Sequence, residues 1–207
     1  MKIILASDSS FLIKYGYSLI DIPKDRIKIG YIMTAQKGTR TDHSEKLKLL
    51  IEATGYHFDE IDIEGKSKEE LESLFKDKNV IQVAGGNTFY LLKAIRSSGF
   101  KEFLNEALGM GKIYIGTSAG SYIMCPSIEV SDWSDDSIDR FGVSDFSALN
   151  YVPFVLRVHY KDEMKNFIKE NIKELHHPLR ILRDGQGILV ENDKYTFLGD
   201  GDEVKLI

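Results

Sequence analysis

One serine in the chain has neighbours suited to nucleophilic chemistry. Gly116-Thr-Ser118-Ala-Gly120 has the form Gly-x-Ser-x-Gly, which is typical of a nucleophile elbow, where small residues allow a turn that lifts the serine oxygen out of a sheet. An ordinary glycine and serine turn would also produce this short pattern. An apolar strand pattern before it and a short apolar helix pattern after it favour the elbow. Such a turn directs the backbone N–H of the next residue, Ala119, toward a developing oxyanion.

Ser118 requires a histidine, because a serine hydroxyl is a weak nucleophile until a nearby imidazole takes its proton. The chain contains five histidines. Four lie beside predicted helix ends, namely His43, His57, His176 and His177. His159 alone follows a predicted sheet strand, at the edge where open α/β sheets bind ligands. We therefore predict that His159 is the base, and the alternative is a structural histidine at a strand end.

Composition and charge exclude several classes of protein. With 207 residues and 43% apolar content, residues 1–207 are expected to form one domain. The net charge of −5, with basic residues that alternate with acidic ones, argues against nucleic-acid binding. No His, Cys and acid cluster has metal-ligand spacing, so we expect neither a metal nor another cofactor. One cysteine, Cys125, and a first apolar run of only four residues, Ile3–Ala6, predict a cytoplasmic protein without a membrane partner.

Strand and helix patterns alternate through the first part of the chain. Apolar strands are expected at 3–6, 27–33, 58–63, 80–83 and immediately before Ser118. A helix is expected from residues 42–44 to Gly55, and a capping box at Ser67-Lys-Glu-Glu70 predicts the start of another. Two more helices should bury apolar residues between 91 and 108. This order predicts an α/β three-layer sandwich, in which a mostly parallel sheet has helices on both faces.

The second part of the chain has a looser pattern. Residues 129–139 hold five acidic residues around Trp133 and predict a long exposed loop. A strand is expected at 151–158 and an amphipathic helix at 161–175. Short strands at 181–182, 187–190 and 195–198, with a further candidate at 204–207, are joined by hairpin-like turns. We therefore expect antiparallel strands at the C-terminal edge of the sheet.

Four motifs, in this order, resemble one known family. They are Gly85-Gly86-Asn87-Thr88, Gly116-Thr-Ser118-Ala-Gly120, Pro153-Phe154 leading to His159, and Asp184-Gly185. Together they resemble the serine peptidases that include aspartyl dipeptidase (peptidase E) and cyanophycinase, from the second predicted strand to the last hairpin. The resemblance implies a fold related to class I glutamine amidotransferases. It also implies a Ser–His–Glu or Ser–His–Asp triad that cuts very short peptides or isoaspartyl linkages.

The resemblance assigns roles to several residues. It makes Ser118 the nucleophile, His159 the base and Asp184 the acid, where the more usual family residue is glutamate. The second oxyanion donor falls on Gly86. Without the resemblance, the glycine pair and Asp184-Gly185 would be interpreted as simple turns. Asp132 is an alternative acid, because it would give the order Ser, Asp, His that α/β-hydrolases have.

A short peptide is the expected substrate, and Asn87, Asp132 and Arg157 are expected to contact it. Aspartyl dipeptidases carry an arginine for the acidic side chain of the substrate in a longer segment after the catalytic histidine, which this chain lacks. Arg157 is the nearest arginine in sequence, on the same side of the predicted strand as His159. It could equally be a solvated strand residue. We therefore predict a weaker or altered preference for N-terminal aspartate.

Other functions stay open at the level of sequence. An α/β-hydrolase-type esterase or amidase would place the acid before the histidine, and an amidotransferase-like glutaminase would need cysteine at position 118. A non-catalytic binding protein that retains the fold is a further alternative. The sequence is compatible with a monomer or a homodimer.

Overall fold

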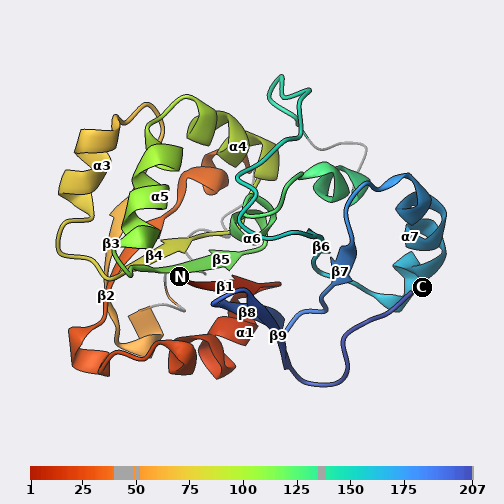
Figure 1. Ribbon diagram of the computed structural model, residues 1–207, viewed down its shortest axis with the longest axis horizontal. Helices are drawn as coiled ribbons and strands as arrows, with labels where there is room; N and C mark the ends of the chain where they lie inside the picture. The colour runs from red at the N-terminus through yellow and green to blue at the C-terminus, as the bar shows by residue number, and fades with distance from the viewer. Residues whose placement is uncertain (40–48, 50–51, 135–138, 207) are drawn as a thin grey trace.

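A seven-stranded sheet forms the centre of the computed structural model, which describes residues 1–39, 49, 52–134 and 139–206 (Figure 1). Its strand order is β3-β2-β4-β5-β1-β8-β9. Five strands run parallel: β1 (Lys2–Ala6), β2 (Lys28–Ile32), β3 (His57–Ile61), β4 (Val80–Val83) and β5 (Ile113–Thr117). At one edge β8 (Gln186–Glu191) and β9 (Lys194–Gly199) are antiparallel. The predicted mostly parallel sheet with antiparallel strands at its C-terminal edge is confirmed.

Helices cover both faces of this sheet, as the sequence predicts. On one face lie α3 (Lys68–Leu74), α4 (Thr88–Arg96), α5 (Phe100–Gly109) and α6 (Ala119–Tyr122). The other face is covered by α1 (Ser9–Lys14) and the 3₁₀ turns Gly16–Leu19 and Lys24–Arg26. Side chains of each strand alternate between the two apolar layers. In β1, for example, Ile3 and Leu5 face one layer while Ile4 and Ala6 face the other.

Local signals in the sequence correspond to two helix ends. The predicted capping box begins α3: Ser67 Oγ accepts from the Glu70 N–H at 3.3 Å, and the Ser67 N–H donates to Glu70 Oε2 at 2.8 Å. Gly55 has φ +68°, which suits the predicted left-handed helix end. Most of the helix expected between residue 42 and Gly55 lies outside the described residues.

Two predicted strands do not belong to the main sheet. Instead β6 (Val155–Arg157) and β7 (Leu179–Ile181) pair in parallel as a separate two-stranded sheet. The expected strand at 151–158 is shortened to Val155–Arg157, and Pro153 offers no N–H for a ladder at its start. Residues 181–182 were predicted to be antiparallel, whereas β7 runs parallel to its partner. At 204–207, Val204 makes an isolated bridge to Ile181, and residue 207 lies outside the described part.

The predicted helix at 161–175 is divided into three pieces. A 3₁₀ turn at Asp162–Met164 leads into α7 (Lys165–Asn171), and a second 3₁₀ turn follows at Ile172–Glu174. Ile168, on the expected apolar face, is fully buried, but Phe167 on that face is 46% exposed. The expected loop at 129–139 begins with a 3₁₀ turn at Glu129–Ser134, and residues 135–138 lie outside the described part. Within the described ranges, no helix combines the length and apolarity needed to cross a membrane.

Packing between the sheet and α3 leaves no room for a side chain at one position of β2. A Cβ atom added to Gly30 would overlap the ring of Phe75, which is fully buried and lies 4.9 Å from the Phe103 ring between their centroids. The ring therefore occupies the space over the strand that a side chain would need. This contact fixes how closely the helical layer approaches the sheet.

We predict that Gly30→Ala lowers the free energy of unfolding by about 1–3 kcal/mol, because the new methyl group must displace the Phe75 ring. Urea denaturation monitored by circular dichroism measures the change. The matched control is Gly109→Ala at the end of α5, where an added Cβ meets no atom within 4 Å. Equal destabilisation by both variants would contradict this account of the packing.

Candidate active site

Strand register brings three distant segments to one edge of the sheet. Ala6 at the end of β1 is paired with Thr117 at the end of β5 and with Gly187 near the start of β8. Because β1 and β5 are parallel and β8 is antiparallel to both, the residues just beyond these positions meet at the same edge. Those residues are Ser7, Ser118 and the turn that contains Asp184. The main sheet alone therefore places a serine and an acid close together.

Ser118 lies in a strained turn between β5 and α6. Its φ is 50° and its ψ is −107°, a conformation that residues with a side chain rarely adopt. The flanking glycines make the turn possible. A Cβ at Gly116 would overlap the Gly120 carbonyl, and a Cβ at Gly120 would overlap the Val83 carbonyl of β4. The Gly-x-Ser-x-Gly pattern thus reflects close backbone approach on both sides of the serine.

A continuous line of hydrogen bonds joins the predicted triad. His159 Nε2 lies 2.9 Å from Ser118 Oγ, and His159 Nδ1 lies 2.6 Å from Asp184 Oδ1. The side chains of His159 and Asp184 are 44% and 55% exposed. The imidazole can accept the serine proton at one nitrogen while the carboxylate orients it at the other. The structure therefore brings together Ser118, His159 and Asp184, and it does not bring Asp132 to the imidazole.

His159 reaches this position by a route that the sequence did not predict. It lies two residues beyond β6, outside the main sheet, and has φ 55°. The chain is held there by its neighbours, because the Tyr160 N–H donates to the Leu182 carbonyl at 3.0 Å. The positive φ breaks the two-residue alternation of a strand. The expectation that Arg157 and His159 share one side of a strand is therefore wrong.

Ser7 contacts the predicted triad, and the sequence analysis missed it. Its side chain is fully buried, its Oγ donates to Asp184 Oδ1 at 3.0 Å, and the same oxygen accepts from the His159 N–H at 2.9 Å. The Ser7 hydroxyl therefore contacts both the Asp184 carboxylate and the backbone of His159. A usable signal was present, since Ser7 directly follows an apolar strand that ends at the carboxyl edge of the sheet.

The turn that carries Asp184 is also fixed by hydrogen bonds to the segment after β1. The Gly185 N–H donates to Asp8 Oδ1 at 2.9 Å, and the Ser7 N–H donates to the Gln186 carbonyl at 2.9 Å. Asp8 also caps α1, since the Phe11 N–H donates to the same Oδ1 atom at 3.4 Å. The position of the acid thus depends on two consecutive residues, Ser7 and Asp8.

An aromatic and ionic contact ties the histidine segment to the acid segment. The Arg183 guanidinium lies 4.9 Å from the centroid of the Tyr160 ring, and its Nη2 donates to Asp162 Oδ1 at 2.6 Å. This hydrogen bond to Arg183 holds the pKa of the exposed Asp162 carboxyl below its usual value. The residues that follow His159 are therefore attached to the residue that precedes Asp184.

The glycine pair after β4 borders Ser118. A Cβ on Gly85 would lie 3.2 Å from Ser118 Cβ, so the backbone of Gly85 packs against the serine. Gly86 has φ +145°, and a Cβ there would overlap the Ala35 carbonyl. Ala119 is the first residue of α6, where a helical N–H has no partner within its own helix. Gly85 packs against Ser118, and Gly86 and Ala119 are the residues that follow these two. The N–H groups of Gly86 and Ala119 therefore belong to neighbouring turns, as the predicted pair of oxyanion donors requires.

Two predicted substrate contacts are engaged with the protein itself. The Asn87 side chain caps α4, where its Oδ1 accepts from the Tyr90 N–H at 2.9 Å, and its Nδ2 donates to the Asp139 carbonyl at 2.9 Å. Asp132 forms a two-point ion pair with Arg140, at 2.7 Å to Nε and 2.6 Å to Nη2. Asn87 thus joins Asp139 to the start of α4, and Asp132 is paired with Arg140.

Arg157 has an interior position. It is 5% exposed, its Nη1 donates to the Val130 carbonyl at 3.3 Å, and its Nη2 lies 3.5 Å from Met164 Sδ. A guanidinium enclosed in this way does not fit the predicted contact with a substrate carboxylate. Arg157 is enclosed because β6 lies in the separate two-stranded sheet, where its side chain packs against Val130 and Met164. Among the described residues, no group of three or more His, Cys, Asp or Glu side chains is placed to hold a metal ion.

Comparisons with known proteins agree with this geometry. The profile of peptidase family S51 matches residues 14–198. An uncharacterized peptidase of Listeria monocytogenes is 33% identical over 122 residues, which cover 59% of this chain and 60% of that protein. A peptidase E of Nostoc sp. is 33% identical over 134 residues, which cover 64% of this chain and 52% of that protein. The chain thus spans less than two thirds of the length of either relative.

A solved structure has the same fold. The crystal structure of a peptidase E-like protein of Listeria monocytogenes superposes with a TM-score of 0.82 at 24% identity, covering 97% of this chain and 98% of that one. At this identity the likeness shows the fold alone. The predicted three-layer fold, similar to class I glutamine amidotransferases, is thereby confirmed.

We predict that Ser7→Ala slows the reaction of Ser118 with a fluorophosphonate by about 10- to 100-fold, since a hydrogen bond to a charged group contributes about 1.5–3 kcal/mol. The rate of adduct formation, followed by mass spectrometry, measures the effect. The control is Ser97→Ala, because the Ser97 hydroxyl donates to the Ala94 carbonyl at the end of α4 and does not contact the triad. An unchanged rate in Ser7→Ala would show that the buried hydroxyl does not position the acid and base.

Proposed function

The chain belongs to peptidase family S51 and is a serine-type peptidase, and we propose that it hydrolyses short peptides through an acyl-enzyme on Ser118. The observation that carries this proposal is the unbroken hydrogen-bonded line from Ser118 Oγ through His159 to Asp184 Oδ1. Its order and geometry match what nucleophilic attack on a peptide carbonyl requires. The strained turn at Ser118 supports the same role, because it presents the hydroxyl at the ligand-binding edge of the sheet.

We assign one group of the chain to each step of the proposed reaction. His159 Nε2 takes the Ser118 proton as Oγ attacks the carbonyl carbon, and Asp184 stabilises the imidazolium that forms. The N–H groups of Ala119 and Gly86 donate to the oxyanion. His159 then gives its proton to the leaving amine, which breaks the peptide bond and leaves the acyl group on Ser118. A water molecule, activated by the same imidazole, releases the acyl group and restores the serine.

A contact beside the proposed oxyanion donor supports a restriction to short peptides. Asn87 follows Gly86, and its Nδ2 donates to the Asp139 carbonyl at 2.9 Å. Asp139 therefore lies beside this end of the proposed site, where it limits the length of chain that can extend past Gly86. The buried position of Arg157, which was the predicted contact for an acidic substrate residue, supports a weaker or altered preference for N-terminal aspartate. We place the reaction in the cytoplasm, in a monomer or homodimer without nucleic-acid or membrane partners.

We predict that Ser118→Ala and His159→Ala each lower the turnover of a dipeptide by several orders of magnitude, because the triad acts as a unit. Release of free amino acid from a panel of dipeptides measures turnover, and circular dichroism checks that the fold is retained. Near-normal hydrolysis by purified Ser118→Ala would rule out the acyl-enzyme on this residue.

We also predict that substitutions of Asp184 and Asp132 have very different effects on turnover. Asp184→Asn should reduce turnover by about 10⁴, as loss of the orienting carboxylate does in other triads. Asp132→Asn breaks an ion pair with Arg140 that lies away from the imidazole, so it should mainly raise KM. Steady-state kinetics on both variants separate these effects. If Asp132→Asn had the larger effect on kcat, the orienting role would belong to Asp132.

A further inference from the structure

The buried side chain of Tyr122 in α6 has no part in the reaction steps described above. It is 5% exposed and lies in the apolar layer on the face of the sheet that α3 to α6 cover. Its Oη accepts a hydrogen bond from the Val158 N–H at 3.3 Å, and its own N–H donates to the Ser118 carbonyl at 3.0 Å. One residue therefore contacts both the backbone of the proposed nucleophile and the residue that precedes the proposed base.

The backbone around the proposed base is held at three consecutive N–H groups. After Val158, the His159 N–H donates to Ser7 Oγ at 2.9 Å, and the Tyr160 N–H donates to the Leu182 carbonyl at 3.0 Å. His159 has φ 55°, a conformation that persists in a residue with a side chain only where its surroundings fix it. The three acceptors come from different segments of the chain, so they fix this conformation relative to both the main sheet and α6.

The Tyr122 hydroxyl is a neutral acceptor in the protein interior. Burial raises the pKa of Tyr122, and the positive charge of the buried Arg157 guanidinium opposes this rise without reversing it. The phenol therefore keeps its proton at physiological pH. Its contact with the Val158 N–H is thus a hydrogen bond between neutral groups in the interior, where an N–H without a partner is costly.

We propose that Tyr122 is a positioning residue, which fixes the backbone of His159 relative to Ser118 so that Nε2 stays within hydrogen-bonding distance of Oγ. This assignment rests on the proposed peptidase function. In Tyr122→Phe the ring still fills its place in the core, but the Val158 N–H loses its acceptor. The segment then shifts toward another partner for this N–H, and a shift of about 1 Å at a catalytic group can slow a reaction about 10²-fold.

Steady-state kinetics of dipeptide hydrolysis test this role. We predict that Tyr122→Phe lowers kcat on the order of 10- to 100-fold and leaves KM within about twofold of the wild-type value. The reason is that the buried ring does not touch substrate, so the shift of His159 affects only the chemical step. Circular dichroism checks that the variant is folded. An unchanged kcat, or a change in KM alone, would overturn the assignment.

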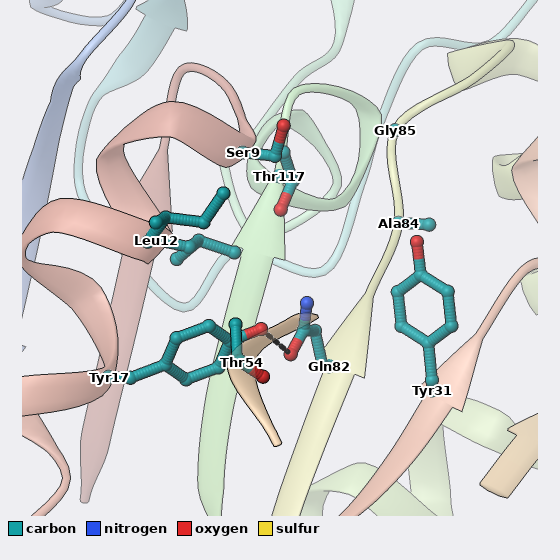
Figure 2. Close-up of a pocket in the computed structure, with 10 residues that line it drawn as sticks. Ser9, Leu12, Tyr17, Tyr31, Thr54, Gln82, Ala84, Gly85 and Thr117 are labelled. Carbon is teal, nitrogen blue, oxygen red and sulfur yellow. Dashed lines mark hydrogen bonds between the residues drawn. The ribbon is translucent and has the colours of Figure 1, made fainter. Parts of the chain in front are cut away.

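Tyr17→Phe is the matched control. Tyr17 is also buried, in the apolar layer on the opposite face of the sheet, and its Oη donates to Gln82 Oε1 at 3.1 Å (Figure 2). This variant also loses a buried phenolic hydroxyl, but it keeps every contact of the His159 segment, so its kcat should stay near the wild-type value. An equal loss of kcat in both variants would contradict the assignment.

Proton NMR separates positioning from a general loss of stability. The proton that His159 Nδ1 shares with Asp184 Oδ1 in their 2.6 Å hydrogen bond should resonate far downfield of the backbone amide protons. In Tyr122→Phe this resonance should weaken or disappear through faster exchange with water, whereas Tyr17→Phe should retain it. A reduced kcat with an unchanged resonance would show that Tyr122 does not act through His159.

Labelling of the wild-type protein with a fluorophosphonate distinguishes this inference from the proposed function. If Ser118 is labelled and dipeptides are cut, but Tyr122→Phe is equally active, the positioning role alone fails. If Ser118 is not labelled and no dipeptide is cut, the proposed function fails. The NMR comparison then still decides whether Tyr122 holds His159 in place.

Discussion

Asp184 Oδ1 accepts two hydrogen bonds, from His159 Nδ1 at 2.6 Å and from Ser7 Oγ at 3.0 Å, and these bonds unite three segments that are distant in the chain. The Ser7 hydroxyl also accepts from the His159 N–H. Since Ser7 is fully buried directly after a central strand, it attaches the base and the acid to the rigid part of the sheet. The triad, of which only Asp184 is exposed, therefore does not depend on loop geometry alone, because each member is held by backbone or buried polar contacts.

The nucleophile is fixed by a different set of contacts at the same edge. The Ser118 N–H donates to the Ala6 carbonyl at 3.1 Å, and Ser121 Oγ donates to the carbonyls of Ala6 and Gly116. These bonds, and the close backbone approach at Gly116 and Gly120, offset the cost of the positive φ at Ser118. The parallel arrangement of β1 and β5 then brings this turn beside Ser7. Both halves of the site thus depend on the end of β1.

Much of this arrangement could be predicted from sequence. Apolar runs separated by helix patterns were sufficient for the parallel sheet, and the glycines around Ser118 indicated a tight turn. The place of His159 after a predicted strand and the family resemblance both indicated the base, and the resemblance supplied Asp184, which the structure places in contact with His159. The separate sheet of β6 and β7 could not be predicted, because a strand of only three residues carries no pattern that identifies its partner. The place of Ser7 directly after an apolar strand was a usable signal, but a single serine there has no periodic pattern that marks it as part of a site. The interior position of Arg157 was not predicted, because β6 lies in the separate sheet and not in the main one.

The most direct test of the proposed mechanism is a crystal structure of the protein after reaction with a fluorophosphonate. The adduct of this reagent on a serine resembles the tetrahedral intermediate. The account predicts a covalent bond from phosphorus to Ser118 Oγ and His159 Nε2 within hydrogen-bonding distance of the adduct. It also predicts a phosphonyl oxygen that accepts from the N–H groups of Ala119 and Gly86. An adduct on another residue, or a phosphonyl oxygen directed away from both N–H groups, would contradict it.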